Sequence, residues 1–198
     1  MARTVFFSFH YKRDIMRVQV VKKHYVTKGN YTAAGYFDGS LEEKAKKEGA
    51  EIVKRLIDSG LEGSSVTCVL IGKETSTRNW VYYEILKSVA LGMGVLGIRI
   101  HQIGDPTQGK DIAGSNPFEF SGFGTKERDD KLYPMINYAS GWKEAPYLQA
   151  IGRSTSPYLP REGSVILSSV FTVYDWISND GFNNFSKWVE TAARQAGR

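Results

Sequence analysis

Val66-Thr67-Cys68-Val69-Leu70-Ile71-Gly72 is a strongly apolar run that predicts a buried β-strand. A polar connection over residues 73–78 follows, and then comes Asn79-Trp80-Val81-Tyr82-Tyr83-Glu84-Ile85-Leu86-Lys87-Ser88. This second stretch predicts a helix that begins at Asn79, a residue type favoured at the N-cap. A strand, a loop and a helix in this order place the start of the helix at the carboxyl edge of the sheet. Open α/β sheets bind their ligands at that edge.

The predicted helix has two faces of different chemistry. Residues four apart share a face, so Trp80 and Glu84 are expected side by side. An indole can stack on a flat or cationic ring, and a carboxylate can bind sugar hydroxyls or stabilise an oxocarbenium ion. A structural interpretation stays open, in which Trp80 anchors the core and Glu84 is a solvated charge. The apolar stripe expected to pack on the sheet consists of Tyr82, Ile85, Leu86, Val89 and Met93.

Strand and helix signals alternate along the first half of the chain. Strands are expected at residues 4–9, 35–37, 66–71 and 95–100, and helices at 15–26, 40–59 and 79–93. The middle helix starts with a capping box at Ser40. Short connections between alternating elements predict right-handed crossovers. The expected fold class is therefore α/β: a flavodoxin-like, doubly wound, mainly parallel sheet with helices on both faces.

The pattern becomes less regular after His101. Residues 122–130 form a glycine- and charge-rich stretch that predicts a loop, and residues 131–142 predict a pair of strands. Two further helices are expected at 168–177 and 182–193. We expect one domain over residues 1–198, with a core over about 1–101 and a C-terminal elaboration over about 102–198 that forms a wall of the pocket or an interface.

Charge and composition limit the classes of partner. The formal net charge of +5 favours anionic partners, which include nucleic acid, a membrane surface and a dinucleotide. The lysines alternate with acids, as is typical of solvated helix faces, so nucleic acid is disfavoured. No apolar stretch has the length of a membrane-spanning helix, and the first residues lack the layout of a signal peptide. The single cysteine, Cys68, favours a reduced, cytoplasmic protein, and its expected burial makes it a poor nucleophile.

Several residues are expected near Glu84 at the carboxyl edge of the sheet, Ser8 and Phe9 through their backbone amides. Ser8 and Phe9 end the first strand, His10 follows it, and Asp38 follows the second strand, where a role in turn formation is the alternative. There is no Gly-x-Gly-x-x-Gly after the first strand and no P-loop, so dehydrogenase and NTPase chemistry are disfavoured. The histidines and the cysteine do not have the spacing of a metal site.

These motifs together resemble a TIR-type domain. The opening run from Val5 to Tyr11, with Asp14 after it, resembles the first box of TIR domains. The loop over 37–40 occupies the place of the BB loop, and Trp80-x-x-x-Glu84 is similar to the tryptophan–glutamate pair of TIR enzymes that cleave NAD. Over nearly its whole length, the chain resembles the divergent TIR-like ThsB family of Thoeris anti-phage systems.

The resemblance implies an enzyme that breaks the nicotinamide–ribose bond of NAD, with NAD as substrate and no separate cofactor. It implies a cyclic ADP-ribose-type product that activates an effector in antiviral defence. Glu84 matches the catalytic glutamate, Trp80 would shape the nicotinamide part of the pocket, and the loop from Ser8 to Tyr11 would contact the substrate. The run His10-Tyr11-Lys12-Arg13 stands where other TIR domains have small residues. This difference leaves three questions open: which residues contact the phosphates, whether the chain forms a homo-oligomer, and whether the reaction ends in hydrolysis or in cyclisation.

Two other functions remain open from the residues alone. In the first, the chain is a non-catalytic TIR-type module for protein interaction. In the second, it is a small nucleotide-binding or nucleic-acid-associated α/β domain, which only the basic pI favours.

Overall fold

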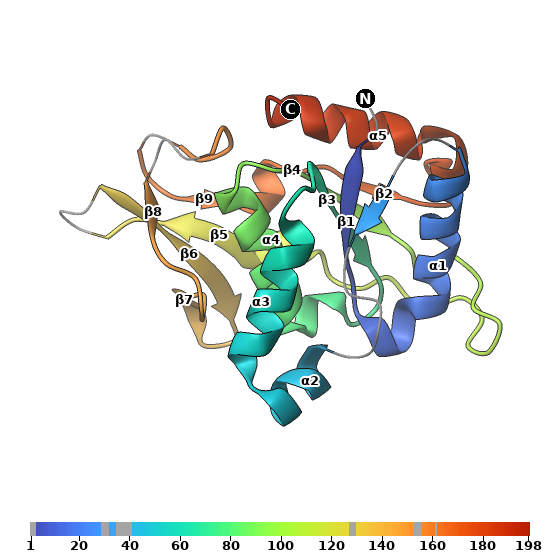
Figure 1. Ribbon diagram of the computed structural model, residues 1–198, viewed down its shortest axis with the longest axis horizontal. Helices are drawn as coiled ribbons and strands as arrows, with labels where there is room; N and C mark the ends of the chain where they lie inside the picture. The colour runs from blue at the N-terminus through green and yellow to red at the C-terminus, as the bar shows by residue number, and fades with distance from the viewer. Residues whose placement is uncertain (1–2, 29–31, 35–40, 127–129, 153–155, 161) are drawn as a thin grey trace.

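The computed structural model describes residues 3–28, 32–34, 41–126, 130–152, 156–160 and 162–198 (Figure 1). Its central element is a five-stranded sheet in the order β2-β1-β3-β4-β10, with every neighbouring pair parallel. These strands are β1 (Thr4–Ser8), β2 (Thr32–Ala34), β3 (Val66–Ile71), β4 (Gly94–Arg99) and β10 (Val173–Asp175). This order, with its switch at β1 and β3, is that of flavodoxin-like folds. The predicted fold class is therefore confirmed.

Helices cover both faces of this sheet (Figure 1). On one face, Val5 and Phe7 pack in a core cluster with α1 (Tyr11–Lys28) and α5 (Gly181–Gln195). On the other face, Phe6 packs with α3 (Ala50–Leu61) and α4 (Asn79–Ala90). The alternation of β1 side chains between the two clusters follows from the two-residue period of a strand. Among the described residues, no helix combines the length and apolar character needed to cross a bilayer.

The helix expected over 40–59 is two helices. Gly49, with φ of 93°, ends α2 (Leu41–Glu48) and stands at the start of α3. This left-handed backbone favours glycine and interrupts the apolar spacing that suggested one continuous helix. The expected C-cap at Gly60 is wrong, because α3 runs on to Leu61 and Glu62 is its C-cap. Gly60 instead allows close packing, since a Cβ there would lie 2.9 Å from the Phe6 ring.

Two smaller expectations also change. The described strand β2 lies at 32–34, whereas the strand expected at 35–37 and the capping box at Ser40 fall outside the described residues. Arg78, not Asn79, occupies the N-cap of α4, and its side chain makes no capping hydrogen bond. The apolar stripe of that helix is confirmed at Tyr82, Ile85, Leu86 and Val89, which are all buried. The helix expected to reach residue 93 ends at Ala90, so the buried Met93 lies beyond it.

A second, antiparallel sheet packs against α4. It has the order β7-β6-β5-β9, with β8 paired to β6, and its Phe123 and Ile136 share a core cluster with Tyr82. The expected strand pair over 131–142 is confirmed, but the loop expected from residue 122 is wrong, because 121–124 pair with strands on both sides. The strands are β5 (Ser121–Gly124), β6 (Lys131–Tyr138), β7 (Gly141–Glu144), β8 (Ile151–Gly152) and β9 (Val165–Ile166).

The helix expected over 168–177 is also wrong. A short 3-10 turn, η3 (Leu167–Ser169), leads into β10, which pairs with β4 in parallel. Short apolar spacing fits either element, and here the vacant edge of β4 determines the outcome. Gly97 permits the close approach, because a Cβ at that position would lie 3.0 Å from Val173 Cγ2. The last strand and last helix of the parallel layer thus come from the chain after residue 101, and the expected closing helix is confirmed as α5.

Candidate active site

Glu84 and Ser8 meet inside the molecule at the carboxyl end of β1. Ser8 is fully buried and points to the same face of the sheet as Phe6, where α4 packs. Its hydroxyl donates a hydrogen bond of 2.5 Å to Glu84 Oε2, and Glu84 is only 3% exposed. A hydrogen bond to a carboxylate is stronger than one between neutral groups. Glu84 is therefore a buried, oriented acid, and the interpretation of it as a solvated surface charge is wrong.

Trp80 stands one helical turn before Glu84 and is 7% exposed. Its indole stacks on the Tyr147 ring, with centroids 5.6 Å apart and an interplanar angle of 9°, and meets Tyr83 edge-on. Tyr147 belongs to the segment before β8, is half exposed, and has φ of 67°, a backbone conformation uncommon outside glycine. Sequence reasoning missed Tyr147, because an isolated aromatic residue in an irregular stretch carries no periodic signal.

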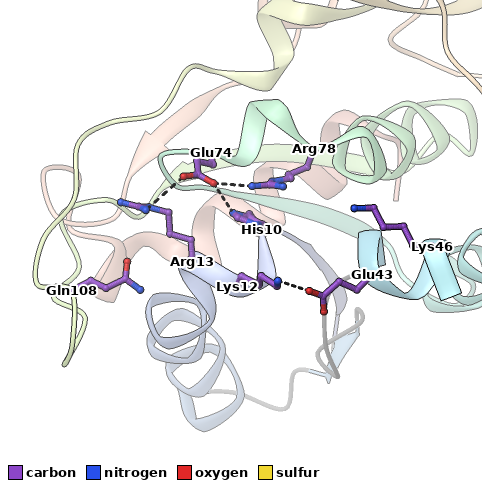
Figure 2. Close-up of a pocket in the computed structure, with 8 residues that line it drawn as sticks. All are labelled: His10, Lys12, Arg13, Glu43, Lys46, Glu74, Arg78 and Gln108. Carbon is purple, nitrogen blue, oxygen red and sulfur yellow. Dashed lines mark hydrogen bonds and ion pairs between the residues drawn. The ribbon is translucent and has the colours of Figure 1, made fainter.

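The other predicted site residues lie in different surroundings. The Phe9 ring packs against the core cluster on the α1 and α5 face, opposite to Glu84, and lies 6.4 Å from the ring of Tyr11. His10, 5% exposed, lies at the start of α1 and lines a pocket of about 500 Å³ (Figure 2). Asp38 lies outside the described residues. The structure thus brings Ser8 into contact with Glu84. His10 follows Ser8 by two residues along the chain.

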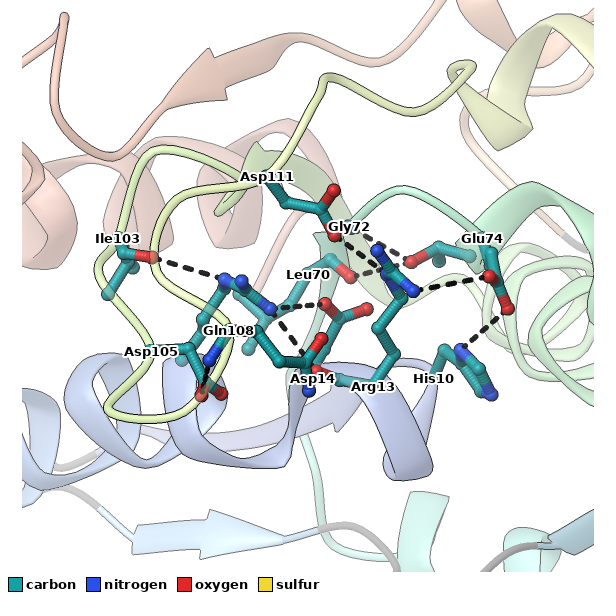
Figure 3. A network of polar contacts seen from close by, with 12 residues as sticks. His10, Arg13, Asp14, Leu70, Gly72, Glu74, Ile103, Asp105, Gln108 and Asp111 are labelled. Atoms are coloured by element: carbon teal, nitrogen blue, oxygen red, sulfur yellow. Dashed lines mark hydrogen bonds and ion pairs between the residues drawn. The ribbon is translucent and has the colours of Figure 1, made fainter.

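Asp14 and Arg17 form a buried network at the same edge of the sheet. Figure 3 shows Asp14 among the polar groups around it. Arg17 Nη1 lies 3.4 Å from Asp14 Oδ1. The guanidinium also donates to the carbonyl oxygens of Ile103, Arg13 and Gly109, at 3.1, 3.2 and 2.9 Å. At Gly72, a Cβ would lie 2.1 Å from Asp14 Oδ2, so only glycine fits there. The network fastens α1 to the loops that follow β3 and β4.

Burial raises the pKa of Asp14 from 3.8 to about 6, against the opposing attraction of Arg17. Burial also raises the pKa of the Cys68 thiol, which agrees with its expected poor reactivity as a nucleophile. Within the described part of the chain, no group of three or more histidines, cysteines and acids is placed to hold a metal ion.

The pKa of Asp14 predicts a pH dependence of stability. Between about pH 4 and 6 the folded protein keeps the proton of Asp14, whereas the unfolded chain loses it. The stability that depends on a protonated Asp14 is therefore full below about pH 4 and is lost as pH rises through about 6. The free energy of unfolding falls by about 3 kcal/mol over this pH range. We expect Asp14→Asn to remove this dependence, so that urea unfolding measured between pH 4 and 7 shows the variant gaining stability relative to the wild type as pH rises. The same pH dependence of the unfolding free energy in the wild type and in Asp14→Asn would contradict this role of Asp14.

The hydrogen bond between Ser8 and Glu84 predicts a positioning role for Ser8. Ser8→Ala should lower kcat for the NAD cleavage that the resemblance implies by about tenfold or more, because a hydrogen bond to a charged group contributes about 1.5–3 kcal/mol. KM should change little, since the variant keeps the pocket intact. Ser121→Ala is the matched control, because Ser121 is equally buried and bonds the Pro117 carbonyl oxygen in the second sheet. An equal effect of both variants on kcat would reduce Ser8 to a structural role.

Comparison with known proteins places the chain in a family. The family model described as "Thoeris protein ThsB, TIR-like domain" matches residues 6–105, a range that includes Ser8, Trp80 and Glu84. A protein of Bacillus cereus (strain MSX-D12), named "Putative cyclic ADP-D-ribose synthase ThsB1", is 45% identical over 195 residues. The match covers 96% of this chain and 100% of that protein, so it includes the second sheet as well as the parallel layer. The chain belongs to the ThsB family of TIR-like proteins.

Proposed function

We propose that this protein cleaves the nicotinamide–ribose bond of NAD and converts the ADP-ribose part into a cyclic ADP-ribose-type signal. The observation that carries the proposal is the buried Glu84 carboxylate, held by Ser8 at the carboxyl edge of β1. The name of the Bacillus cereus relative at 45% identity, "Putative cyclic ADP-D-ribose synthase ThsB1", supports the same reaction.

The first step needs charge stabilisation more than proton transfer. Nicotinamide is a cationic leaving group, so the bond between its ring nitrogen and the ribose C1′ breaks with the electron pair going to nitrogen, and neutral nicotinamide departs. Positive charge develops at C1′ and the ring oxygen, where the Glu84 carboxylate would stabilise it and hydrogen-bond the neighbouring ribose hydroxyls. The low-dielectric surroundings of this buried carboxylate strengthen such an interaction.

The second step decides between a cyclic and a hydrolysed product. A nucleophile of the same molecule, an adenine nitrogen or a ribose hydroxyl, attacks C1′, and a hydroxyl nucleophile then loses its proton. Holding the two ends of one molecule together favours this attack over attack by water. We assign substrate contacts to Trp80 and Asp38, to His10, and to Tyr11 at the start of α1. Ser8 and Phe9 would contact the substrate through their backbone amides.

The cellular part of the proposal follows from the signal. NAD enters as the substrate and the reaction needs no further cofactor. The product acts as a diffusible nucleotide that activates a separate effector in antiviral defence. The protein works in the cytoplasm, where NAD is present, and a homo-oligomer would be the active assembly.

Incubation of the purified protein with NAD tests the proposal. We expect release of nicotinamide together with a product lighter than ADP-ribose by one water, both measured by liquid chromatography with mass spectrometry. The same assay is also applied to extracts of phage-infected cells that express the protein, because the enzyme would be active only there if it needs infection as a stimulus. Absence of nicotinamide release under both conditions would instead support the non-catalytic interaction module.

A further inference from the structure

We propose that Thr67 and Ser88 are positioning residues for Glu84, because they hold its backbone in place while Ser8 holds its carboxylate. The inference rests on the proposed function and adds to it the groups that determine where the acid stands. Thr67 belongs to β3 and Ser88 to the second half of α4, and both are 0% exposed. They act on Glu84 and are not expected to touch the substrate.

A chain of two hydrogen bonds connects β3 to the backbone of Glu84. The Ser88 hydroxyl donates to the carbonyl oxygen of Glu84 at 2.6 Å, and Thr67 Oγ1 lies 2.7 Å from Ser88 Oγ. A hydroxyl has only one hydrogen to donate, and Ser88 gives its hydrogen to a carbonyl oxygen that can only accept. Thr67 must therefore be the donor to Ser88, so the chain runs in one direction from β3 to Glu84.

Thr67 and Ser8 face α4 from neighbouring strands. Thr67 pairs with Phe6 in the register of β1 and β3, and Ser8 stands two residues after Phe6. Paired residues and residues two apart share one face of a sheet, and Phe6 marks this face as the one that α4 covers. Each strand thus offers one hydroxyl to the helix. One hydroxyl binds the Glu84 carboxylate, and the other acts through Ser88 on the Glu84 carbonyl group.

The remaining contact between α4 and the sheet is apolar. Val81, Ile85 and Val89 pack in one core cluster with side chains of β3 and β4. Apolar burial has no preferred direction, whereas a hydrogen bond prefers a narrow range of distances and angles. The bonds at positions 84 and 88, about one helical turn apart, therefore define how α4 is rotated and how far it stands from the sheet. This precision matters because a displacement of about 1 Å can lower a rate by about 100-fold.

A purely structural interpretation of Ser88 has a counterpart in the second sheet. Buried serines in helices often bond the carbonyl oxygen four residues before them, because a buried hydroxyl needs a partner. Ser121 does so with the carbonyl oxygen of Pro117 at 3.0 Å, and it is as buried as Ser88. Ser88 differs because it also binds a hydroxyl of β3 and because its carbonyl partner belongs to Glu84. Ser121→Ala is therefore the matched control for Ser88→Ala.

Kinetics with NAD test the positioning role. Thr67→Val, which keeps the shape of the side chain, and Ser88→Ala should each lower kcat by about fivefold, the value of one neutral hydrogen bond, with KM unchanged. Thr67→Ser keeps the hydroxyl and should restore most of the wild-type kcat, and Ser121→Ala should leave kcat unchanged. The double variant Thr67→Val with Ser88→Ala should lose no more than either single variant, because one chain joins the two residues.

The double variant also separates positioning from folding. It leaves neither of the two hydroxyls behind without a partner, so its thermal unfolding should stay close to that of the wild type while its kcat stays about fivefold lower. Wild-type kcat in Thr67→Val, recovery of kcat in the double variant, or an equal loss in Ser121→Ala would overturn the inference and leave the proposed function standing.

Crystal structures of the wild type, Thr67→Val and Thr67→Ser provide a readout that does not depend on turnover. The distance of 2.5 Å from Ser8 Oγ to Glu84 Oε2 should lengthen in Thr67→Val and be kept in Thr67→Ser. If the wild type does not cleave NAD but Glu84 shifts in Thr67→Val alone, the positioning role stands and the proposed function is wrong. If NAD is not cleaved and Glu84 keeps its place in both variants, the positioning role is wrong as well.

Discussion

Replacing Glu84 with glutamine should lower kcat for NAD cleavage by about two to three orders of magnitude, the loss typical when one electrostatic stabiliser of a transition state is removed. The amide keeps the shape of the carboxylate, and its oxygen can still accept the hydrogen bond from Ser8. It carries no charge, so it cannot stabilise the positive charge that develops at the ribose C1′. Nicotinamide release under saturating NAD measures the effect, because kcat should fall more than KM changes.

Controls for this variant concern folding and surface charge. Thermal unfolding should leave Glu84→Gln close to the wild type, since the buried hydrogen bond is preserved. Glu62→Gln, an exposed acid just after α3, should keep full activity. Wild-type turnover in Glu84→Gln would exclude Glu84 as the stabilising acid, even if the protein does consume NAD.

The largest loss of stability is expected from Arg17→Met, at about 3–5 kcal/mol. The substitution leaves the buried Asp14 carboxyl without its cationic neighbour and deprives the carbonyl oxygens of Ile103 and Gly109 of their donors. Methionine fills part of the arginine volume, so the loss comes mainly from unsatisfied polar groups and less from a cavity. Urea unfolding at pH 7 measures it, because most Asp14 groups are ionised above a pKa of about 6.

A double variant shows how much of this loss belongs to the buried charge. Asp14→Asn combined with Arg17→Met should recover part of the stability, because no ionisable group is then left alone in the interior. Arg55→Met, an exposed position on α3, should change the unfolding free energy by about 0.5 kcal/mol at most. A loss below about 1 kcal/mol in Arg17→Met would mean that water replaces the guanidinium at low cost.

The parallel layer was largely predictable because its signals are local. The apolar run of β3, the aromatic strand β1 and the periodic face of α4 each identify an element within a few residues. Elements that depend on distant partners were missed: β10 is a strand only because the edge of β4 accepts it, and β5 only because two strands flank it. Gly49 divides a helix whose two halves have the same periodicity, which a pattern of apolar residues cannot reveal.

The candidate site was predictable in its location and less so in its contacts. The rule that ligands bind at carboxyl edges places Ser8, His10 and Glu84 in one region. The hydrogen bond between Ser8 and Glu84 joins residues on separate elements, so only the three-dimensional packing reveals it. The same holds for the stacking of Tyr147 on Trp80 and for the cations that Lys46 and Arg78 bring to the His10 pocket. The catalytic role of Glu84 remains a prediction. The same is true of the substrate contacts expected from Ser8, Phe9, His10, Tyr11, Asp38 and Trp80.

The pairing of β10 with β4 has a consequence for biosynthesis. Val173 pairs with Gly97, so the ribosome adds about 75 residues after β4 before the strand that covers it exists. At translation rates of roughly 5–20 residues per second, this interval lasts about 4–15 s. Throughout it, the nascent polypeptide presents an unpaired strand edge, the kind of surface on which neighbouring chains aggregate. Chaperones that shield such edges during synthesis should therefore raise the yield of the folded protein.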